Sequence, residues 1–462
     1  MPAKNHDKRP LADNNKYLYT QLRNLRTVFD RSLEAVLGEK RALDRFLSSY
    51  WRENRQFGSR DRRLFSESIF AFYRFYGWLK LLLNDEEKAL LESNRSREIP
   101  GRSVAMLLAM AWALENLPAE PAHKLLCQEF ELPQIPPVEN IFDPQQLWRQ
   151  KRFAALAEQY LLHPVELPPW EALQNSWSNE FLQDIPDKEA YFRALAVRPP
   201  LWLRVQNASV DSVVKELSQA GLTVRRNRAL PNALAVVGGS VNLFTLEAYR
   251  AGRVEVQDLA SQVIAYVCNP QKGERWWDCC AGAGGKTLAL ADLMQRTGKV
   301  VAGDIRSYKL EDLKQRARRG NFPNIETRPW DGNKVPPRRS NKFDGILIDA
   351  PCSCSGVWRR NPDGRWNSSP EEVAKVTTIQ HTVLENVLTA LRPNGVLVYA
   401  TCSAFDAENT AMVQDFLARH AEFELESFAD PLTGEPTGGM LKIIGASENC
   451  DTMFVARMRK KY

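Results

Sequence analysis

The chain has 462 residues, a net charge of +6 and 44% hydrophobic residues. Its length allows about three domains, and the absence of an apolar run of about 18 residues argues against a membrane span. The polar start, residues 1–16, argues against a secretory signal. Eight cysteines without regular spacing and only five histidines favour reduced cytoplasmic thiols over disulfides or zinc, so we expect no metal.

The first part of the chain, residues 1–165, is predicted to be all helical. Apolar side chains recur at helical spacing within 22–37, 64–76 and 106–117. Four arginines flank the second of these helices and are candidates for binding a nucleic acid: Arg60, Arg62, Arg63 and Arg74. Residues 166–195 are predicted to be a linker, because prolines, which break helices, are frequent in and around this stretch.

A small α+β subdomain is predicted for residues 196–255. Residues 201–205 have the pattern of a strand, and a helical pattern follows over 210–220. Two further short apolar runs, 222–224 and 233–237, are typical of strands. The order of these elements predicts a β-α-β unit.

From residue 256 to the C-terminus, short β-rich runs alternate with helical patterns, which is typical of a parallel α/β sheet. Ligands of such sheets bind beyond the carboxyl ends of the strands. The residues predicted at these ends are Asp278, Asp304, Asp331, Asp349 and Thr401. Residues 369–372 form a capping box that predicts the start of a helix reaching about residue 391.

A glycine-rich loop follows the first strand of this sheet and leads into a helix. It comprises Cys280, Ala281, Gly282, Ala283, Gly284, Gly285 and Lys286. A phosphate-binding P-loop needs glycine where this chain has cysteine at 280, so an NTPase is disfavoured. Asp304 is placed to accept hydrogen bonds from ribose hydroxyls, and Asp331 from an adenine amine. The combination suits an adenosyl ligand with a cationic sulfur and an amino acid tail.

Two cysteine motifs follow two successive predicted strands. The first, residues 349–356, contains Asp349, Cys352 and Cys354, and the second, residues 401–403, contains Cys402. Two thiols and a carboxylate would then face one crevice, which favours nucleophilic chemistry. Cys354 is interpreted as a packing residue.

Positive charge is concentrated between residues 296 and 342, where 13 lysines and arginines face 5 acidic residues. Such clusters suit phosphate binding, although a solvated helix face is an equally good interpretation. The clusters are Arg316, Arg318, Arg319, Arg338 and Arg339.

Together these motifs resemble the NOP/Sun family of RNA cytosine-5 methyltransferases. The resemblance covers about residues 196–462 and rests on 278–287, 349–363 and 399–409. It implies a Rossmann-like class I methyltransferase domain over 256–462, with S-adenosylmethionine bound by the glycine loop and by the acids at the strand ends. The loop lacks the proline that is usual in the family. The helical first part shows a diffuse resemblance to the NusB-like domain of some RNA methyltransferases.

The resemblance also implies a reaction, which is methylation of cytosine in small-subunit (16S) rRNA. Cys402 would attack carbon 6 of the base, and Cys352 would help to remove the proton from carbon 5. Asp349 would bind the base and border the cofactor, while Arg359 and Arg360 would hold RNA phosphates.

Two alternatives remain open. One is methylation of cytosine in tRNA, and the other is an rRNA-binding assembly factor with weak catalysis. The presence of both cysteines and three acids favours the enzyme. We expect RNA as partner, no membrane, a monomer and a cytoplasmic location.

Overall fold

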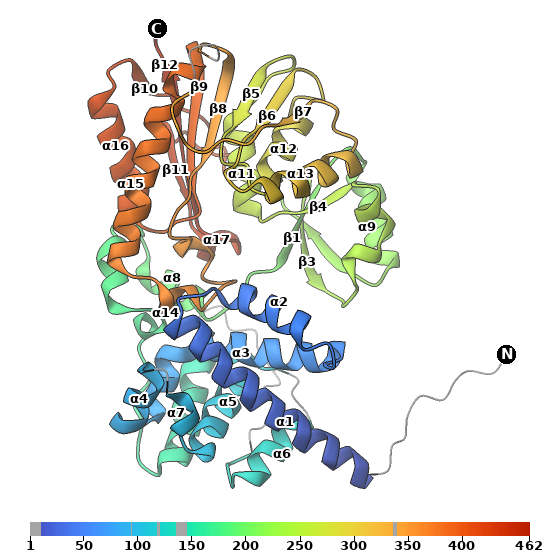
Figure 1. Ribbon diagram of the computed structural model, residues 1–462, viewed down its shortest axis with the longest axis vertical. Helices are drawn as coiled ribbons and strands as arrows, with labels where there is room; N and C mark the ends of the chain where they lie inside the picture. Colours follow the sequence, from blue (N-terminus) through green and yellow to red (C-terminus); the bar gives the residue numbers. More distant parts are fainter. Residues whose placement is uncertain (1–10, 94, 118–120, 135–145, 336–339) are drawn as a thin grey trace, which may run out of the picture. The chain divides into compact units, whose positions relative to one another are not determined.

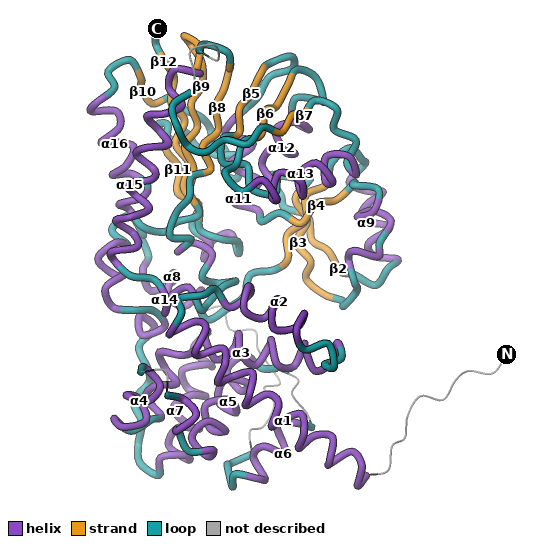
Figure 2. Tube along the Cα trace, in the orientation of Figure 1, coloured by secondary structure: helices purple, strands orange, loops and turns teal. Residues whose placement is uncertain are grey.

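A computed structural model describes residues 11–93, 95–117, 121–134, 146–335 and 340–462. Contacts between Cα atoms divide the chain into two units. Unit 1 comprises residues 1–176, 192–197 and 361–368, and unit 2 comprises residues 177–191, 198–360 and 369–462. Strands occur only in unit 2 among the described residues, as Figure 2 shows by colour.

The described part of unit 1 is helical, as predicted. Its helices are α1 (Leu11–Leu33), α2 (Leu43–Glu53), α3 (Ser59–Leu79), α4 (Asp85–Glu92), α5 (Gly101–Glu115), α6 (Ala122–Glu129), α7 (Leu147–Leu161) and α14 (Gly364–Asn367), and α8 (Lys188–Leu195) crosses the border to unit 2 (Figure 1). Helix α5 is buried on every side from Val104 to Leu114, which explains why its sequence is apolar all round. Among the described residues, no helix is long and apolar enough to cross a membrane.

Residues 361–368 fall inside the range predicted as the methyltransferase domain, yet they fold within unit 1. The fully buried Arg365 donates hydrogen bonds of 2.8–3.2 Å to the carbonyl oxygens of Arg74, Leu173 and Leu195. Trp366 donates to the carbonyl oxygen of Tyr73 at 2.8 Å. These acceptors satisfy the buried guanidinium of Arg365 and fix its position within unit 1.

The arginines predicted to bind nucleic acid in unit 1 have different environments. Arg60 and Arg63 are exposed in the first turn of α3. Arg74 is 1% exposed, and its Nε lies 2.9 Å from a carboxylate oxygen of Glu115. The prediction for Arg74 was therefore wrong, because helical periodicity turns this position toward the core.

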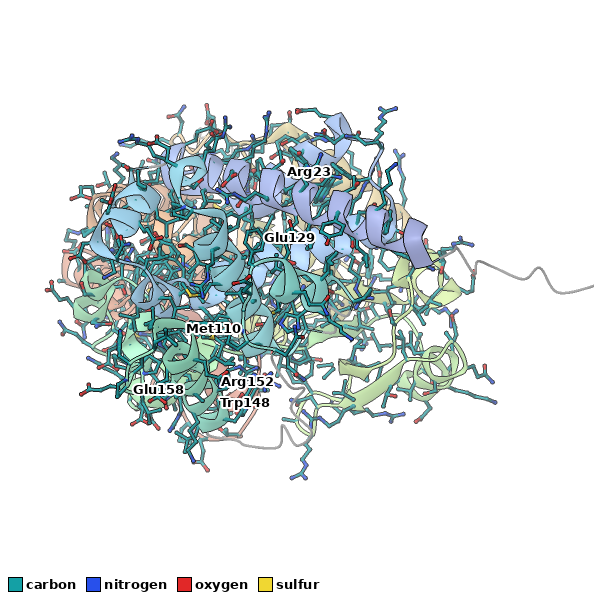
Figure 3. The ribbon with its side chains drawn as sticks, turned by 90° about the horizontal axis from the view of Figure 1, so that it is seen from below. Arg23, Met110, Glu129, Trp148, Arg152 and Glu158 are labelled. Carbon is teal, nitrogen blue, oxygen red and sulfur yellow. The ribbon has the colours of Figure 1, made fainter. Side chains whose placement is uncertain are left out.

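A cavity of about 260 Å³ lies between α1, α5 and α6 in unit 1. Arg23 of α1 and Glu129 of α6, both labelled in Figure 3, belong to its lining. Most of the other lining side chains are apolar, among them Leu22, Val104 and Leu108. The cavity is therefore an apolar recess with a few charged groups.

Unit 2 contains a small antiparallel sheet, which corresponds to the predicted α+β subdomain. Its strand order is β2-β3-β1-β4. The elements are β1 (Leu201–Val205), α9 (Val210–Gln219), β2 (Thr223–Arg226), β3 (Ala233–Gly238), α10 (Glu247–Arg250) and β4 (Val254–Val256). Leu203, Val213 and Leu234 are completely buried and join α9 to the sheet.

The main sheet of unit 2 has the order β10-β12-β9-β8-β5-β6-β7, with β11 paired to β12. Its strands are β5 (Arg275–Asp278), β6 (Lys299–Ala302), β7 (Ile325–Thr327), β8 (Phe343–Asp349), β9 (Leu391–Thr401), β10 (Phe423–Leu425), β11 (Met440–Ile443) and β12 (Met453–Lys460). The strands from β7 to β9 in this order run parallel, and β12 is antiparallel to β9. This is the predicted Rossmann-like arrangement.

Helices cover both faces of the main sheet (Figure 1). They are α11 (Leu259–Cys268), α12 (Gly285–Leu293), α13 (Ser307–Arg319), α15 (Pro370–Val387), α16 (Thr410–Arg419) and the short α17 (Gly445–Glu448). Leu347 and Val398 pack with α11, α12 and α13, whereas Ile346 and Leu397 pack with α15 and α16. This follows because successive side chains of a strand point to opposite faces. The capping box places the start of α15 at Pro370, as predicted.

Candidate active site

The two cysteine motifs lie at the carboxyl ends of β8 and β9, which are neighbouring parallel strands. Asp349 pairs with Ala400, so the chain leaves both strands at the same level. The Sγ atoms of Cys352 and Cys402 are 3.3 Å apart. The N–H of Gly356 donates to the carbonyl oxygen of Cys402 at 2.9 Å, and a Cβ at this glycine would lie 1.9 Å from the carbonyl oxygen of Thr452 and 2.9 Å from that of Cys402. Glycine therefore permits the close approach of the first loop to the second and to the C-terminal segment.

Cys354 is the third thiol of this group. Its Sγ and those of Cys352 and Cys402 all lie within 4.8 Å of one another. The side chain is exposed and its backbone is left-handed, with φ of 57°. Cys354 is thus not packed into the core, contrary to the interpretation from sequence.

The pKa values of the two half-buried thiols, Cys352 and Cys402, lie well above the ordinary value. For Cys352 the causes are hydrogen bonds with Cys354 and Cys402, followed by burial. For Cys402 the hydrogen bond from Cys352 lowers the pKa, but the contact with Cys354, burial and the charge of Asp349 raise it by more. Both thiols are therefore neutral at rest, and a thiolate must be formed when the substrate binds.

A buried cation lies beside the thiols. Lys286, in the first turn of α12, is 8% exposed, and its Nζ is 2.7 Å from Oδ2 of Asp349. Burial alone would lower the pKa of Lys286, but the charge of Asp349 and its hydrogen bond raise it above the ordinary value. Lys286 is thus a fixed positive charge at the carboxyl end of β8.

The glycine loop connects β5 to α12 and bends toward the end of β6. The N–H of Ala281 donates to the carbonyl oxygen of Gly303 at 2.8 Å, and that of Gly282 donates to Oδ2 of Asp304 at 2.8 Å. Gly284 has φ of +87°, and a Cβ there would lie 2.0 Å from Leu313. Gly284 therefore serves the packing of α13 against the loop, whereas a Cβ at Gly282 would meet no atom closer than 4.0 Å.

Asp304 lies just past the end of β6 and is 4% exposed. Its carboxylate accepts hydrogen bonds from the backbone and the guanidinium of Arg306, at 2.8–3.1 Å. Burial raises the pKa of Asp304, but the bonds from Arg306 and Gly282 lower it by more, so that the net pKa is below the ordinary value. Asp304 is therefore a charged acceptor at the rim of the glycine loop.

Comparison with known proteins identifies the family. Residues 265–459 match the family model described as 16S rRNA methyltransferase RsmB/F. A probable ribosomal RNA small subunit methyltransferase B of Synechocystis is 30% identical over 332 residues, which cover 70% of each chain. The ribosomal RNA small subunit methyltransferase B of Klebsiella pneumoniae is 29% identical over 95% of this chain and 98% of its own.

The chain belongs to the RsmB/F family of 16S rRNA methyltransferases. Two solved structures share the fold of this chain. The crystal structure of PH0851 has a TM-score of 0.70 and 24% identity, covering 93% of this chain and 99% of its own. NSun6 from Pyrococcus horikoshii with SFG has a TM-score of 0.54 and 19% identity, covering 62% of this chain and 98% of its own.

The residues of this RsmB/F member fit an adenosyl methyl donor. The open space beside Gly282 leaves room for a ligand against the backbone. Asp304 offers the carboxylate that a ribose diol requires, and Lys286 and Asp349 offer opposite charges for a zwitterionic amino acid tail. Cys280 and Ala283 complete the loop between these groups.

Asp331 differs from the prediction in its place on the sheet. Strand β7 ends at Thr327, so Asp331 does not end the strand. Its side chain is exposed and accepts hydrogen bonds from the backbone and side chain of Asn333, which lower its pKa. A contact of Asp331 with adenine stays a prediction.

Arg359 and Arg360, the arginines expected to hold RNA phosphates, have internal partners in unit 2. Arg359 is 5% exposed and donates to the carbonyl oxygens of Gly445 and Cys450 at 2.7 and 3.1 Å. Arg360 forms ion pairs with Asp258 and Asp451. Both side chains thus hold the C-terminal segment against the sheet, and their RNA contact stays a prediction.

The basic residues between 296 and 342 also include some with internal partners and some that are exposed. Arg316 and Arg319 of α13 form ion pairs with the buried Glu255 of β4. Arg318 on the same helix is exposed. Arg338 and Arg339 lie outside the described residues.

Two polar residues near the site were not predicted as part of it. Asp278 at the end of β5 is completely buried, and its Oδ2 accepts a hydrogen bond of 2.6 Å from the hydroxyl of Thr287. Burial raises the pKa of Asp278 to about 7. Glu408 is also completely buried, beside the cysteine loops. Both residues lie in motifs that carried the resemblance, 278–287 and 399–409, but neither of them was assigned a role in the site from the sequence.

Proposed function

We propose that this 16S rRNA methyltransferase modifies carbon 5 of cytosine, with S-adenosylmethionine as methyl donor and Cys402 as nucleophile. The observation that carries the proposal is the 3.3 Å separation of the Cys352 and Cys402 thiols at two adjacent strand ends. Carbon 5 of cytosine is a poor nucleophile, and addition of a thiolate at carbon 6 makes it reactive. A second thiol at contact distance can then serve the elimination step.

The bond changes follow from this arrangement. Cys402 releases its proton to solvent as the base binds, and its sulfur bonds to carbon 6, so that the electron pair of the 5,6 double bond becomes available at carbon 5. S-adenosylmethionine, when bound, supplies the methyl group that carbon 5 takes up. Cys352, after losing its own proton to solvent, takes the proton of carbon 5 as a thiolate. The electron pair of that C–H bond restores the 5,6 double bond, and the bond between carbon 6 and the sulfur of Cys402 breaks, which leaves Cys402 as a thiolate.

The charged pair next to the thiols supports both steps. Lys286 stabilises a thiolate at Cys402, because a cation nearby favours the charged form of a thiol. Asp349 is placed to hydrogen-bond the polar edge of the base while it remains paired with Lys286. Since the base must leave its stack to reach the thiols, the substrate is an unstacked cytosine.

The helical unit 1 is proposed to bind rRNA in the manner of a NusB-like domain. Its exposed arginines on α3, Arg60 and Arg63, support this assignment. An rRNA substrate supports the expected cytoplasmic location, and the monomeric state stays a prediction. Exposed cations on a helix face suit phosphate contacts that carry no sequence information.

Bisulfite sequencing of total RNA tests the function. In a strain that lacks the gene, one cytosine of 16S rRNA should lose its methyl group, and complementation should restore it. Loss of methylation in a tRNA instead would replace the rRNA assignment by the tRNA alternative. Full methylation in the deletion strain would support the assembly factor.

A further inference from the structure

Glu408 lies directly between the two cysteine loops. It is completely buried and follows β9 on the turn before α16. One carboxylate oxygen, Oε1, accepts from the N–H of Ser353 at 2.8 Å and from the side-chain amide of Gln380 at 3.1 Å. The other, Oε2, accepts from the hydroxyls of Ser353 and Ser403. Each serine directly follows one of the two cysteines in the chain.

The donors around Glu408 stabilise its ionised form, while burial raises its pKa above the ordinary value. The hydroxyls of Ser353 and Ser403 both lie within hydrogen-bond distance of Oε2. The hydroxyl of Ser353 is also 3.1 Å from that of Ser355, which accepts from the N–H of Ala404 at 2.9 Å. The network therefore joins both serines to one carboxylate oxygen.

The backbone of Glu408 is held as well. Its carbonyl oxygen accepts a hydrogen bond of 2.8 Å from the hydroxyl of Tyr399, which is completely buried in β9. Gln380 of α15 also donates to the carbonyl oxygen of Pro351, just before Cys352, at 2.9 Å. Glu408 is thus held by hydrogen bonds to the sheet and to α15, and its position is fixed relative to both cysteine loops.

We propose that Glu408 is a positioning residue that holds the thiols of Cys352 and Cys402 at contact distance. This inference rests on the proposed function only for its catalytic consequence. The covalent path from one sulfur to the other through the sheet is long, whereas Glu408 links the residues next to both sulfurs through two side chains. When the carboxylate is removed, the loops keep the bond between Gly356 and Cys402 but lose the links at Ser353 and Ser403, the residues next to the two sulfurs. A displacement of about 1 Å at a reacting group costs on the order of 100-fold in rate.

The experiment measures the distance between the thiols separately from activity. Diamide, an azo oxidant, accepts two electrons and two protons from a pair of thiols and leaves a disulfide. The rate at which Cys352 and Cys402 close to a disulfide therefore reports how often they meet. Glu408→Ala should slow this closure and lower kcat on the order of 100-fold with an unchanged KM for RNA.

Glu408→Gln is the conservative variant. Its amide oxygen can accept from the N–H of Ser353 and from Gln380, and its amide nitrogen can donate to the serine hydroxyls after these rotate. Disulfide closure should therefore recover toward the wild-type rate. Glu385→Ala, which removes a carboxylate from the outer part of α15, is the matched control and should leave the closure rate unchanged.

If Glu408→Ala unfolds, the double variant Ser353→Ala with Ser403→Ala removes both hydroxyl links to Oε2 while the bond from the N–H of Ser353 to Oε1 remains, and it should also slow closure. An unchanged closure rate in a folded Glu408→Ala or double variant would overturn the positioning role. If the variants close the disulfide slowly but the wild-type protein does not methylate cytosine, the positioning role stands and the proposed function is refuted.

Discussion

Lys286, which is buried, and the half-buried Asp349 form an ion pair at the carboxyl end of β8, with Nζ and Oδ2 2.7 Å apart. The lysine comes from the first turn of α12 and the aspartate from the strand, so the glycine loop brings them together. Because Lys286 interacts electrostatically with Cys402, its positive charge can favour a thiolate there.

Lys286→Gln should make thiolate formation at Cys402 harder. Loss of a nearby cation disfavours the charged form of a thiol, so the pKa of Cys402 should rise. The rate of alkylation of Cys402 by iodoacetamide should therefore require a higher pH than in wild type. Lys314→Gln, which removes an exposed lysine of α13, is the control, and equal pH profiles for all three proteins would contradict the role of Lys286.

The two cysteines should differ when each is replaced. Cys402→Ala should abolish methylation and form no covalent complex with RNA. Cys352→Ala should still attack and transfer the methyl group, and then remain joined to the RNA because release fails. Denaturing electrophoresis with labelled rRNA detects this complex, and Cys354→Ser should behave as wild type. If Cys402→Ala forms the covalent complex and Cys352→Ala does not, Cys352 is the nucleophile and Cys402 serves release.

Asp304→Ala should weaken binding of S-adenosylmethionine by about 1–3 kcal/mol, since it leaves the ribose hydroxyls without an acceptor. Titration calorimetry measures the change. Arg306→Ala is the informative companion, because its guanidinium now occupies the same carboxylate. Removal of Arg306 should leave the affinity equal or higher, whereas a loss as large as that of Asp304→Ala would mean that the arginine itself binds the ligand.

Asp278 should make stability depend on pH. Its folded pKa is about 7, raised mainly by burial, whereas an unfolded aspartate ionises near pH 3.9. As pH rises between these values, the unfolded chain releases a proton that the folded chain keeps, so the folded state loses stability. Asp278→Asn removes this effect, and its Tm should therefore rise relative to wild type between about pH 4 and about pH 8. A Tm difference that does not vary with pH would contradict the raised pKa.

Affinity for rRNA should fall steeply with salt. Each phosphate contact contributes about 0.7 to the slope of log affinity against log salt for a single strand. Replacing Arg60 and Arg63 by glutamine should reduce that slope by about one contact each. Lys88→Gln, an exposed position on α4, is the control. A slope that the double variant leaves unchanged would place the RNA elsewhere.

The sequence by itself determined the order of the elements and the class of the sheet. Strand and helix periods, the glycine loop and the capping box at Ser369 are local patterns, and each was sufficient to locate its element. The same patterns brought Cys352 and Cys402 to two strand ends. Because neighbouring parallel strands end at the same edge, their proximity followed once β8 and β9 were adjacent.

Only the tertiary structure decided which charged residues face inward. Arginine is usually a surface residue, yet Arg74, Arg359 and Arg365 are each buried against partners far away in the chain. Glu408 gained its four donors from Ser353, Gln380 and Ser403 in the same way. A buried charge is stable only where hydrogen-bond acceptors or donors surround it. Segments that are distant in the chain supply these partners, and no local sequence pattern encodes which segments will meet.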